Sequence, residues 1–158
     1  MYSSDLSASE VLAAEARRTG TSDAAFKSVC YQAHVANYGW QDWVCNGWAA
    51  GTEGKNSAIE KVRITMSGNG RFCAQAHVRN YGWLDQDCEA QGGFVEVGTT
   101  GLATPMEALG VWTENGGMLR AQGHVQNIGW MTPTVWGYGH TIGTTGRGLS
   151  LEAIRLWV

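Results

Sequence analysis

The feature that most constrains this chain is a ten-residue segment that occurs three times. It reads YQAHVANYGW at Tyr31–Trp40, AQAHVRNYGW at Ala74–Trp83 and AQGHVQNIGW at Ala121–Trp130. In each copy, apolar residues alternate with Gln and His, which is typical of a β-strand. Self-similarity of this kind indicates a repeat architecture, in which each unit contributes one small supersecondary element.

A second block follows each copy. It begins with Gly-Thr-x-Gly, which we interpret as a turn that needs positive φ. A glutamate comes nine residues after the first glycine, within a branched apolar stretch that predicts another strand. The blocks start at Gly51, Gly98 and Gly143, and their glutamates are Glu60, Glu107 and Glu152. The distance from the repeated tryptophan to the first glycine is 11, 15 and 13 residues, and this variation predicts a surface loop.

Each repeat then contributes a few short strands that cannot bury an apolar face alone. Three such units can share a core by closing around a pseudo-threefold axis, and both a β-prism and a β-trefoil satisfy this requirement. We favour a prism-like closure, because each repeat yields one small sheet. The predicted fold is all-β over residues 30–158, with repeats at about 30–68, 73–115 and 120–158.

The four cysteines fall at matching places in the first two repeats. Cys30 and Cys73 each precede a repeated segment, and Cys45 and Cys88 lie five residues after its tryptophan. The third repeat lacks both members of the pair. This pattern predicts the disulfides Cys30–Cys45 and Cys73–Cys88, and with them a secreted or cell-surface protein. The alternative is a set of buried free thiols in a cytosolic protein.

Residues 1–29 lie outside the repeats and predict one short helical arm. Ser7 and Glu10 form a capping box, two arginines suit the C-terminal end of the helix dipole, and Gly20 is placed for a C-cap. A helix this short is marginal alone in water, so the arm must dock on its own repeat domain or on another protein. The first residues lack the basic and apolar regions of a signal peptide, and we expect any such signal outside the printed sequence.

The composition excludes several classes of partner. Charged residues make up 16% of the chain and the net charge is -3, so no polybasic surface is available for nucleic acid or anionic lipid. No apolar run approaches the roughly 18 residues of a membrane span. Sequence motifs of serine hydrolases, zinc proteases and phosphate-binding loops are absent. We therefore expect a non-enzymatic protein without a cofactor or a bound metal.

The repeat resembles a known family. The pattern Y-x-x-H-V-x-N-x-G-W, a further Trp three residues on, G-T-x-G and a final L-E-A-I-x-L strand resemble the clostridial hydrophobic repeat with a conserved tryptophan, the ChW repeat. The resemblance covers residues 30–158 and implies a bacterial extracellular protein that binds cell-surface or polymeric ligands, without implying a catalytic residue. The further Trp is present as Trp43 but is replaced by Gln86 and Pro133 in the later repeats.

The polar and aromatic residues that recur are expected to specify structure. The His of each repeat can pair with the Glu of its second block in a hydrogen-bond network, rather than converge with its copies on a metal ion. We expect the repeated tryptophans to fill the core or to pack between repeats. These residues are His34, His77, His124, Trp40, Trp83, Trp130, Glu60, Glu107 and Glu152.

Binding residues are expected where the repeats differ, between the repeated tryptophan and Gly-Thr-x-Gly. Aromatic side chains on such loops can stack on the apolar face of a sugar, while neighbouring polar groups contact its hydroxyls. The candidates are Trp43, Trp48, Asp42, Asp85, Trp136, Tyr138 and His140. The alternative is that these aromatics pack beneath the loops.

The sequence therefore predicts a secreted or cell-surface, non-catalytic module with lectin-like recognition of a glycan or cell-wall polymer. The alternative is a protein-interaction adaptor in a secreted assembly, which docks a partner through residues 1–25 of the arm.

Overall fold

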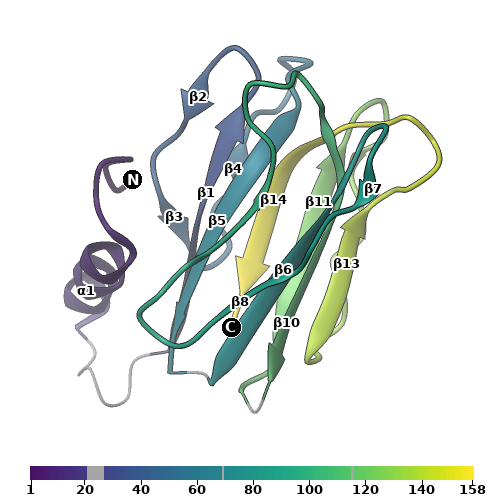
Figure 1. Ribbon diagram of the computed structural model, residues 1–158. Helices are drawn as coiled ribbons and strands as arrows, with labels where there is room; N and C mark the ends of the chain where they lie inside the picture. Colours follow the sequence, from purple (N-terminus) through teal and green to yellow (C-terminus); the bar gives the residue numbers. More distant parts are fainter. Residues whose placement is uncertain (21–26, 69, 115) are drawn as a thin grey trace.

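The computed structural model describes residues 1–20, 27–68, 70–114 and 116–158, which form one helix and three antiparallel sheets (Figure 1). The elements are α1 (Ala8–Thr19), β1 (Ser28–Val35), β2 (Gly39–Trp40), β3 (Val44–Cys45), β4 (Ala50–Gly51), β5 (Ile59–Ser67), β6 (Arg71–Val78), β7 (Gly82–Trp83), β8 (Asp87–Glu89), β9 (Val95–Gly98), β10 (Met106–Glu114), β11 (Arg120–Val125), β12 (Gly129–Trp130), β13 (Gly139–Gly143) and β14 (Leu151–Trp157). The expectation of an all-β fold with a short N-terminal helix is confirmed.

Each sheet is built on two long strands from one repeat. Sheet 1 has the order β2-β1-β5-β9 with β3 beside β1, sheet 2 has the order β13-β10-β6-β7 with β8 beside β6, and sheet 3 has the order β12-β11-β14-β4. One edge of every sheet comes from its own repeat, as the short strand β2, β7 or β12. The opposite edge is supplied by the next repeat, as β9, β13 or β4, so the repeats exchange edge strands in a closed cycle.

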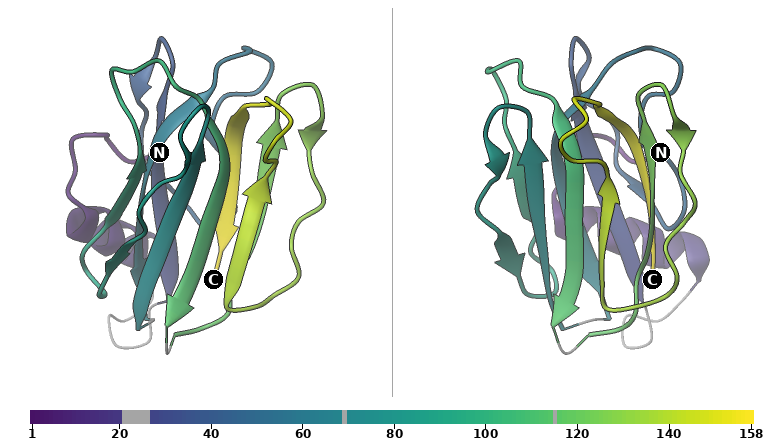
Figure 2. Two further views of the ribbon diagram at one scale, coloured as in Figure 1. Left: turned by 45° about the vertical axis from the view of Figure 1, so that its right-hand side comes forward. Right: turned by 90° about the vertical axis from the view of Figure 1, so that its right-hand side faces the viewer.

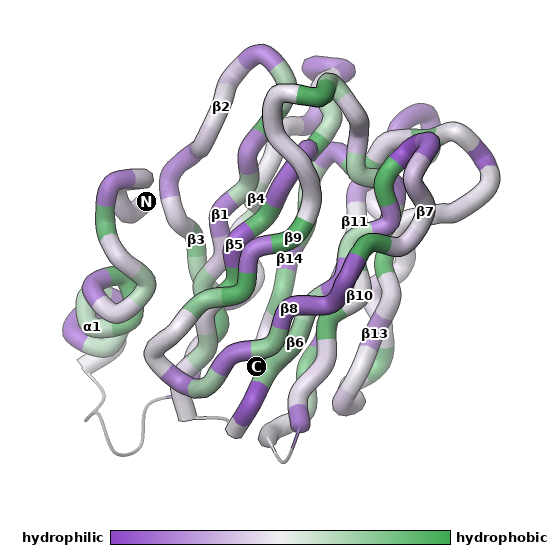
Figure 3. The backbone as a smooth tube through the Cα atoms, viewed as in Figure 1, coloured by the Kyte–Doolittle hydropathy of each residue, from purple (hydrophilic) through white to green (hydrophobic). Residues whose placement is uncertain are grey.

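The three sheets face one another around a single hydrophobic core (Figure 2). Its buried side chains alternate with polar ones along the long strands, as the hydropathy colouring of Figure 3 shows. Among the described residues no sheet closes into a barrel, which a β-trefoil would need. The arrangement is therefore the prism-like one, because each pair of long strands buries only one face and needs the other two sheets to cover it.

In each sheet, the Gly-Thr-x-Gly block of one repeat contacts the glutamate of another repeat. In sheet 1 the register shifts at Glu60, which leaves a β-bulge in β5. The Glu60 carbonyl accepts the N–H of Thr99 at 2.9 Å, and a Cβ on Gly98 would lie 2.2 Å from the same oxygen. Gly98 also has a φ of +109°, so only glycine fits there on both counts. Sheets 2 and 3 repeat this contact, with glycine, threonine and glutamate again in the same places.

The predicted disulfides are confirmed. Cys30–Cys45 joins β1 to β3, and Cys73–Cys88 joins β6 to β8. Each bridge closes a loop of about 15 residues, which contributes roughly 3 kcal/mol in the chain-entropy view. The described residues contain no free cysteine.

The arm folds as its sequence predicts and docks on its own repeat domain. Ser7 and Glu10 form the capping box, and Gly20 ends the helix in the left-handed conformation. The apolar face of α1, which includes Val11 and Leu12, packs on the outer face of sheet 1. Residues 21–26, which belong to the predicted arm of residues 1–29, lie outside the described residues. α1, the one helix that the described residues form, is too short and too polar to span a membrane.

Candidate functional site

The repeated tryptophan, histidine and glutamate form one cluster on the outer face of each sheet. The tight turn before the tryptophan, with Asn37 and Gly39 at positive φ, folds β2 back so that Trp40 lies opposite His34. The two rings meet edge to face at a centroid distance of 5.3 Å. The same contact measures 5.2 Å for His77 with Trp83 and for His124 with Trp130.

These tryptophans were expected in the core or between repeats; the core is wrong, whereas the Trp130 indole does contact Glu53 of the first repeat. Each lies in a two-residue edge strand and points to the same side as the histidine it pairs with, which is the solvent side of the sheet. Trp40 and Trp130 are half-buried, and Trp83 has 44% of its surface exposed. The core positions are taken by the residues that alternate with the histidine, such as Ala33 and Val35.

The histidine of each cluster contacts the glutamate of the bulge. His34 Nδ1 lies 3.1 Å from a Glu60 carboxylate oxygen, and the corresponding distance is 3.2 Å in sheets 2 and 3. The three histidines lie on three different sheets and do not converge. In the described part of the chain, the one group close enough to hold a metal is Cys73, Cys88 and Glu114, whose sulfurs are already joined in a disulfide.

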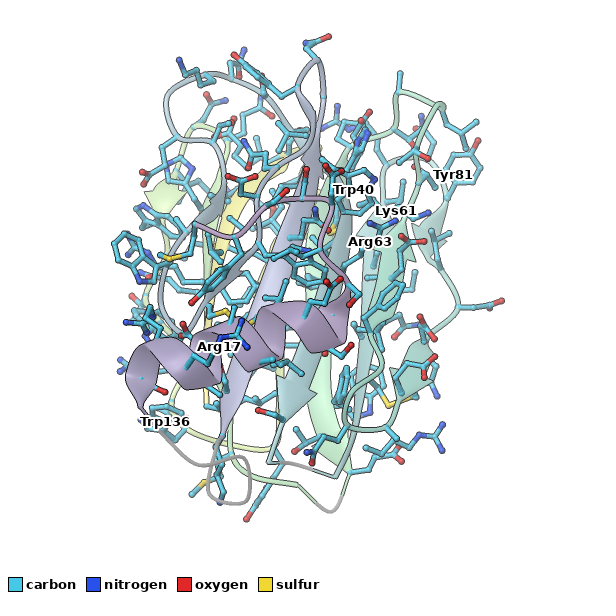
Figure 4. All side chains as sticks on the ribbon, turned by 90° about the vertical axis from the view of Figure 1, so that its left-hand side faces the viewer. Arg17, Trp40, Lys61, Arg63, Tyr81 and Trp136 are labelled. Carbon is cyan, nitrogen blue, oxygen red and sulfur yellow. A yellow bond between two sulfur atoms is a disulfide. The ribbon has the colours of Figure 1, made fainter. Side chains whose placement is uncertain are left out.

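In sheet 1 the open face of the tryptophan is covered by an arginine. The Arg63 guanidinium lies 4.1 Å from the centre of the Trp40 ring, at cation–π distance. Glu96, on the strand exchanged from the next repeat, holds Arg63 at 2.6 Å and Lys61 at 3.2 Å. Burial raises the pKa of Glu96, but hydrogen bonds from Arg63 and Lys61 outweigh it and the pKa is lowered. Figure 4 shows Trp40, Lys61 and Arg63 gathered above α1.

In sheet 3 a second arginine covers the equivalent tryptophan. Arg155 lies 4.2 Å from the ring centre of Trp130 and donates to the Gln122 side-chain oxygen at 3.3 Å. The indole N–H of Trp130 donates to Glu53. Both arginines occupy the same register position, because Arg63 pairs with Gln32 and Arg155 pairs with Gln122.

In sheet 2 this position is a glycine, and the face of the tryptophan is open. Gly110 pairs with Gln75, as the arginines do with their glutamines. Thr141 on β13 lies opposite Gly110, where sheet 1 has Glu96. A cleft of about 340 Å³ results, which we call the sheet 2 cleft. Its lining residues are Gln75, Trp83, Gly110, Trp112, Gly139, His140 and Thr141.

Several predicted binding residues are exposed on the loops. Trp48 is 59% exposed, Trp136 is 48% exposed and Tyr138 is 61% exposed. Trp48 precedes the exchanged strand of sheet 3, whereas Trp136 and Tyr138 precede that of sheet 2. Phe94 precedes the exchanged strand of sheet 1 and is 42% exposed. Figure 4 shows Trp136 at the opposite end of the molecule from Trp40.

The other candidates occupy different surroundings. Trp43 is buried beneath the arm, where its indole N–H donates to the Leu6 carbonyl, so its selection as an exposed binding residue is wrong. Asp42 and Asp85 are exposed, and Asp42 lies 3.5 Å from the N-terminal amine. The His140 ring is held by the Leu119 carbonyl at 2.7 Å.

Sequence reasoning missed the open face of Trp83 and the role of Gly110. An alignment of the three repeats contains the signal, because arginine stands three residues after the glutamate in two copies and glycine in the other. Trp112 carries a similar signal, since its equivalents are Thr65 and Trp157. Neither difference could be interpreted without knowing that the arginine lies over the tryptophan.

Comparisons with known proteins support the repeat in part. The family model described as Clostridial hydrophobic W, or ChW, matches residues 34–68 and 124–158, which form the clusters of sheets 1 and 3. No curated protein and no solved structure matches the chain.

Proposed function

We propose that this protein is a secreted, non-catalytic binding module that recognises a glycan or another cell-surface polymer. The observation that carries the proposal is an exposed aromatic residue just before each exchanged strand, namely Trp48, Phe94 and Tyr138. A protein gains little by exposing a large aromatic ring near the start of each of three exchanged strands, unless the rings contact a ligand. Flat rings of this kind suit the apolar faces of sugars.

The threefold placement of these rings favours a repetitive ligand. Each ring would contribute modestly, about 0.5–1.5 kcal/mol, and several contacts to one polymer would combine. Two disulfides suit a protein that works in an oxidising compartment outside the cell. On the strength of its identical strand pairing, we also assign the segment 77–115 as a third ChW repeat, with Glu107 in the bulge.

A non-catalytic role is supported by the state of the repeated polar groups. Each histidine already contacts a glutamate within the sheet framework, and in sheet 2 Arg79 lies 3.5 Å from the same Glu107 carboxylate. The same pair recurs in all three sheets irrespective of the surface beside it. This is the behaviour of a structural contact rather than of an acid and base serving one substrate.

The docking of the arm favours the loops over the arm as the binding surface. The adaptor alternative needs an apolar helix face for a partner. Here Val11 and Leu12 already pack near Trp43 and the Cys30–Cys45 disulfide. Apart from a pocket lined by Leu12, Ala13 and Ala16, a partner would meet the polar outer face of α1, where Arg17 lies.

The proposal is tested by a glycan array and a pull-down with bacterial cell-wall polysaccharide, using the intact chain and a form without residues 1–25. We expect both forms to bind. Trp48→Ala, Trp136→Ala and Tyr138→Ala should each weaken binding about three- to tenfold and leave the melting temperature unchanged, because these side chains are exposed. Val135→Ala, an exposed apolar neighbour without a ring, is the matched control. The proposal fails if the intact chain binds no carbohydrate.

A further inference from the structure

The three sheets provide an internal comparison of one tryptophan in three settings. In two of them a guanidinium lies over the indole, at 4.1 Å from Trp40 and 4.2 Å from Trp130. In sheet 2 no such group is present among the described residues, and Trp83 is the most exposed of the three. A planar group is thus accommodated on this indole face wherever the chain provides one, and sheet 2 leaves the same place free.

The open space over the Trp83 ring is bounded by neighbouring residues, so it forms a cleft. Gly110 forms the floor of this space. Trp83 lies on the β7 side, and Trp112 lies on β10, two residues beyond Gly110. The exchanged strand contributes Gly139 opposite Trp112, and the lack of a side chain there keeps the cleft wide. A volume of about 340 Å³ lies at the lower end of the range for small-molecule sites, about 300–1,000 Å³.

The polar groups of the cleft suit a neutral ligand. In sheet 1 Glu96 supplies the carboxylate that holds the guanidinium, whereas the cleft has the hydroxyl of Thr141 at that position. None of the lining residues is an acid, a lysine or an arginine. The Gln75 amide donates to the Leu84 carbonyl, and its side-chain oxygen has no partner among the described residues. The equivalent oxygen of Gln122 accepts a hydrogen bond from Arg155.

We propose that the sheet 2 cleft binds one pyranose ring of a neutral glycan. The apolar face of the ring would stack on Trp83, with Trp112 along its edge, and its hydroxyls would donate to the Gln75 oxygen and exchange hydrogen bonds with Thr141. The class of ligand rests on the proposed function, and the site itself rests on the comparison of the three sheets. Within the described residues, the three sheets offer one such site, because Arg63 and Arg155 fill the equivalent places.

The test restores the arginine that sheet 2 lacks. A Cβ on Gly110 would lie 3.6 Å from the nearest atom, which belongs to the Trp112 ring; this is an ordinary contact, and the residue does not have positive φ. Gly110→Arg should therefore fold and cover Trp83, as Arg63 covers Trp40. Leu102→Arg, on an exposed loop outside the cleft, adds the same charge as a control. Trp83→Ala removes the stacking surface by a second route.

The measurement is a titration followed by the indole N–H signals in NMR spectra. The probes are the methyl pyranosides of glucose, galactose, mannose and N-acetylglucosamine, with methylguanidinium as the cationic probe. We expect at least one pyranoside to shift the Trp83 and Trp112 signals, and Gly110→Arg and Trp83→Ala to weaken its affinity at least tenfold. Leu102→Arg should leave the affinity within twofold.

Three results would overturn the inference in different ways. Preferential binding of methylguanidinium at Trp83 would make the cleft a site for a cationic side chain. Glycan binding that survives Gly110→Arg and Trp83→Ala, but is lost with Trp48→Ala or Tyr138→Ala, would leave the proposed function standing without the cleft. Absence of carbohydrate binding by the intact chain would remove both.

Discussion

The outer faces of sheets 1 and 2 share the same framework but differ in what covers the repeated tryptophan. Both carry the edge-to-face pair of tryptophan and histidine, the glutamate in its bulge and a disulfide between matching strands. Sheet 1 is covered by the stacked Arg63 and by the arm, whereas sheet 2 has Gly110 and an open cleft. One register position follows this difference, since it holds arginine where the repeated indole is covered and glycine where the indole is exposed.

The largest loss of stability is expected from changes to the Gly-Thr-x-Gly contact, which sheets 1 and 2 share. Gly98→Ala changes the Gly-Thr-x-Gly contact with sheet 1, and Gly143→Ala changes the one with sheet 2. Each should lower the free energy of unfolding by at least about 3 kcal/mol, because a Cβ would meet a backbone oxygen and φ is positive. Gly101→Ala, which has positive φ but open space, should cost about 1 kcal/mol. Urea unfolding measures all three. Equal losses would show that the close approach has no energetic role.

The two disulfides should differ in how readily they are reduced, because one lies in the covered sheet 1 and the other in the open sheet 2. Removal of either bridge by a pair of serines should cost about 3 kcal/mol. Under mild reductant, however, Cys73–Cys88 should open before Cys30–Cys45, because Cys88 is half-buried while both cysteines of sheet 1 are buried beneath the arm. Alkylation and peptide mapping over time give the order. Simultaneous opening in the intact chain would mean that the arm does not protect its sheet.

Sheet 1 can be made to resemble sheet 2 by removing its arginine. Arg63→Gly should expose Trp40, increase its quenching by acrylamide and lower the free energy of unfolding by about 1 kcal/mol, the range of a partly exposed cation–π contact. Lys61→Ala is the matched control, because Lys61 pairs with the same Glu96, whereas the cation–π contact with the ring comes from Arg63. If Lys61→Ala increases quenching as much as Arg63→Gly does, the guanidinium is not what covers Trp40.

The smallest effect concerns the pH dependence of the arm. A hydrogen bond from Arg18 lowers the pKa of Glu15 despite its burial, and Tyr2 donates to the same carboxylate at 2.7 Å. Because the folded pKa is lower, the contact stabilises the arm above the ordinary pKa of a glutamate, about 4.3, and is lost as the pH falls further. The expected change is about 0.5 kcal/mol, since Arg18 is exposed.

Hydrogen exchange of α1 at pH 6 and pH 3.5, corrected for intrinsic rates, measures this change. Glu15→Gln should reduce the pH dependence and leave the part that comes from Glu10, whose pKa is lowered by the hydrogen bonds of the capping box. Exchange in the strands of sheet 2 is the internal reference and should not follow the same titration. If α1 of Glu15→Gln loosens at pH 3.5 as much as α1 of the unchanged protein, groups other than Glu15 cause the acid response.

Much of the framework could be predicted from the sequence because its signals are local. Alternation in the repeated segment marked the first strand of each repeat, matching cysteines indicated the disulfides, and Ser7 with Glu10 marked the start of α1. Each of these depends on residues that are close in the chain. Three units that each lack a covered face allowed both a β-prism and a β-trefoil, and the prism-like closure was favoured because each repeat yields one small sheet.

The surfaces could not be predicted, because they depend on neighbours that are distant in the sequence. The edge strand of sheet 1 comes from the second repeat, so Arg63 meets Glu96 only after the exchange is known. Trp43 looked like a loop aromatic, and nothing local showed that the arm would cover it. Trp83 was expected in the core or between repeats, because a glycine and a tryptophan do not reveal on which side of a two-residue strand the ring lies.

The cyclic exchange of edge strands also sets an order for the biosynthesis of this protein. Strand β4 is translated early, yet its partner is β14, with Gly51 opposite Ala153. Until β14 emerges from the ribosome, sheet 3 cannot exist and the edge of β4 has nothing to pair with. Such a chain cannot mature one repeat at a time, and a β4 strand that finds the β14 of another molecule would join two chains by the same contact that closes one.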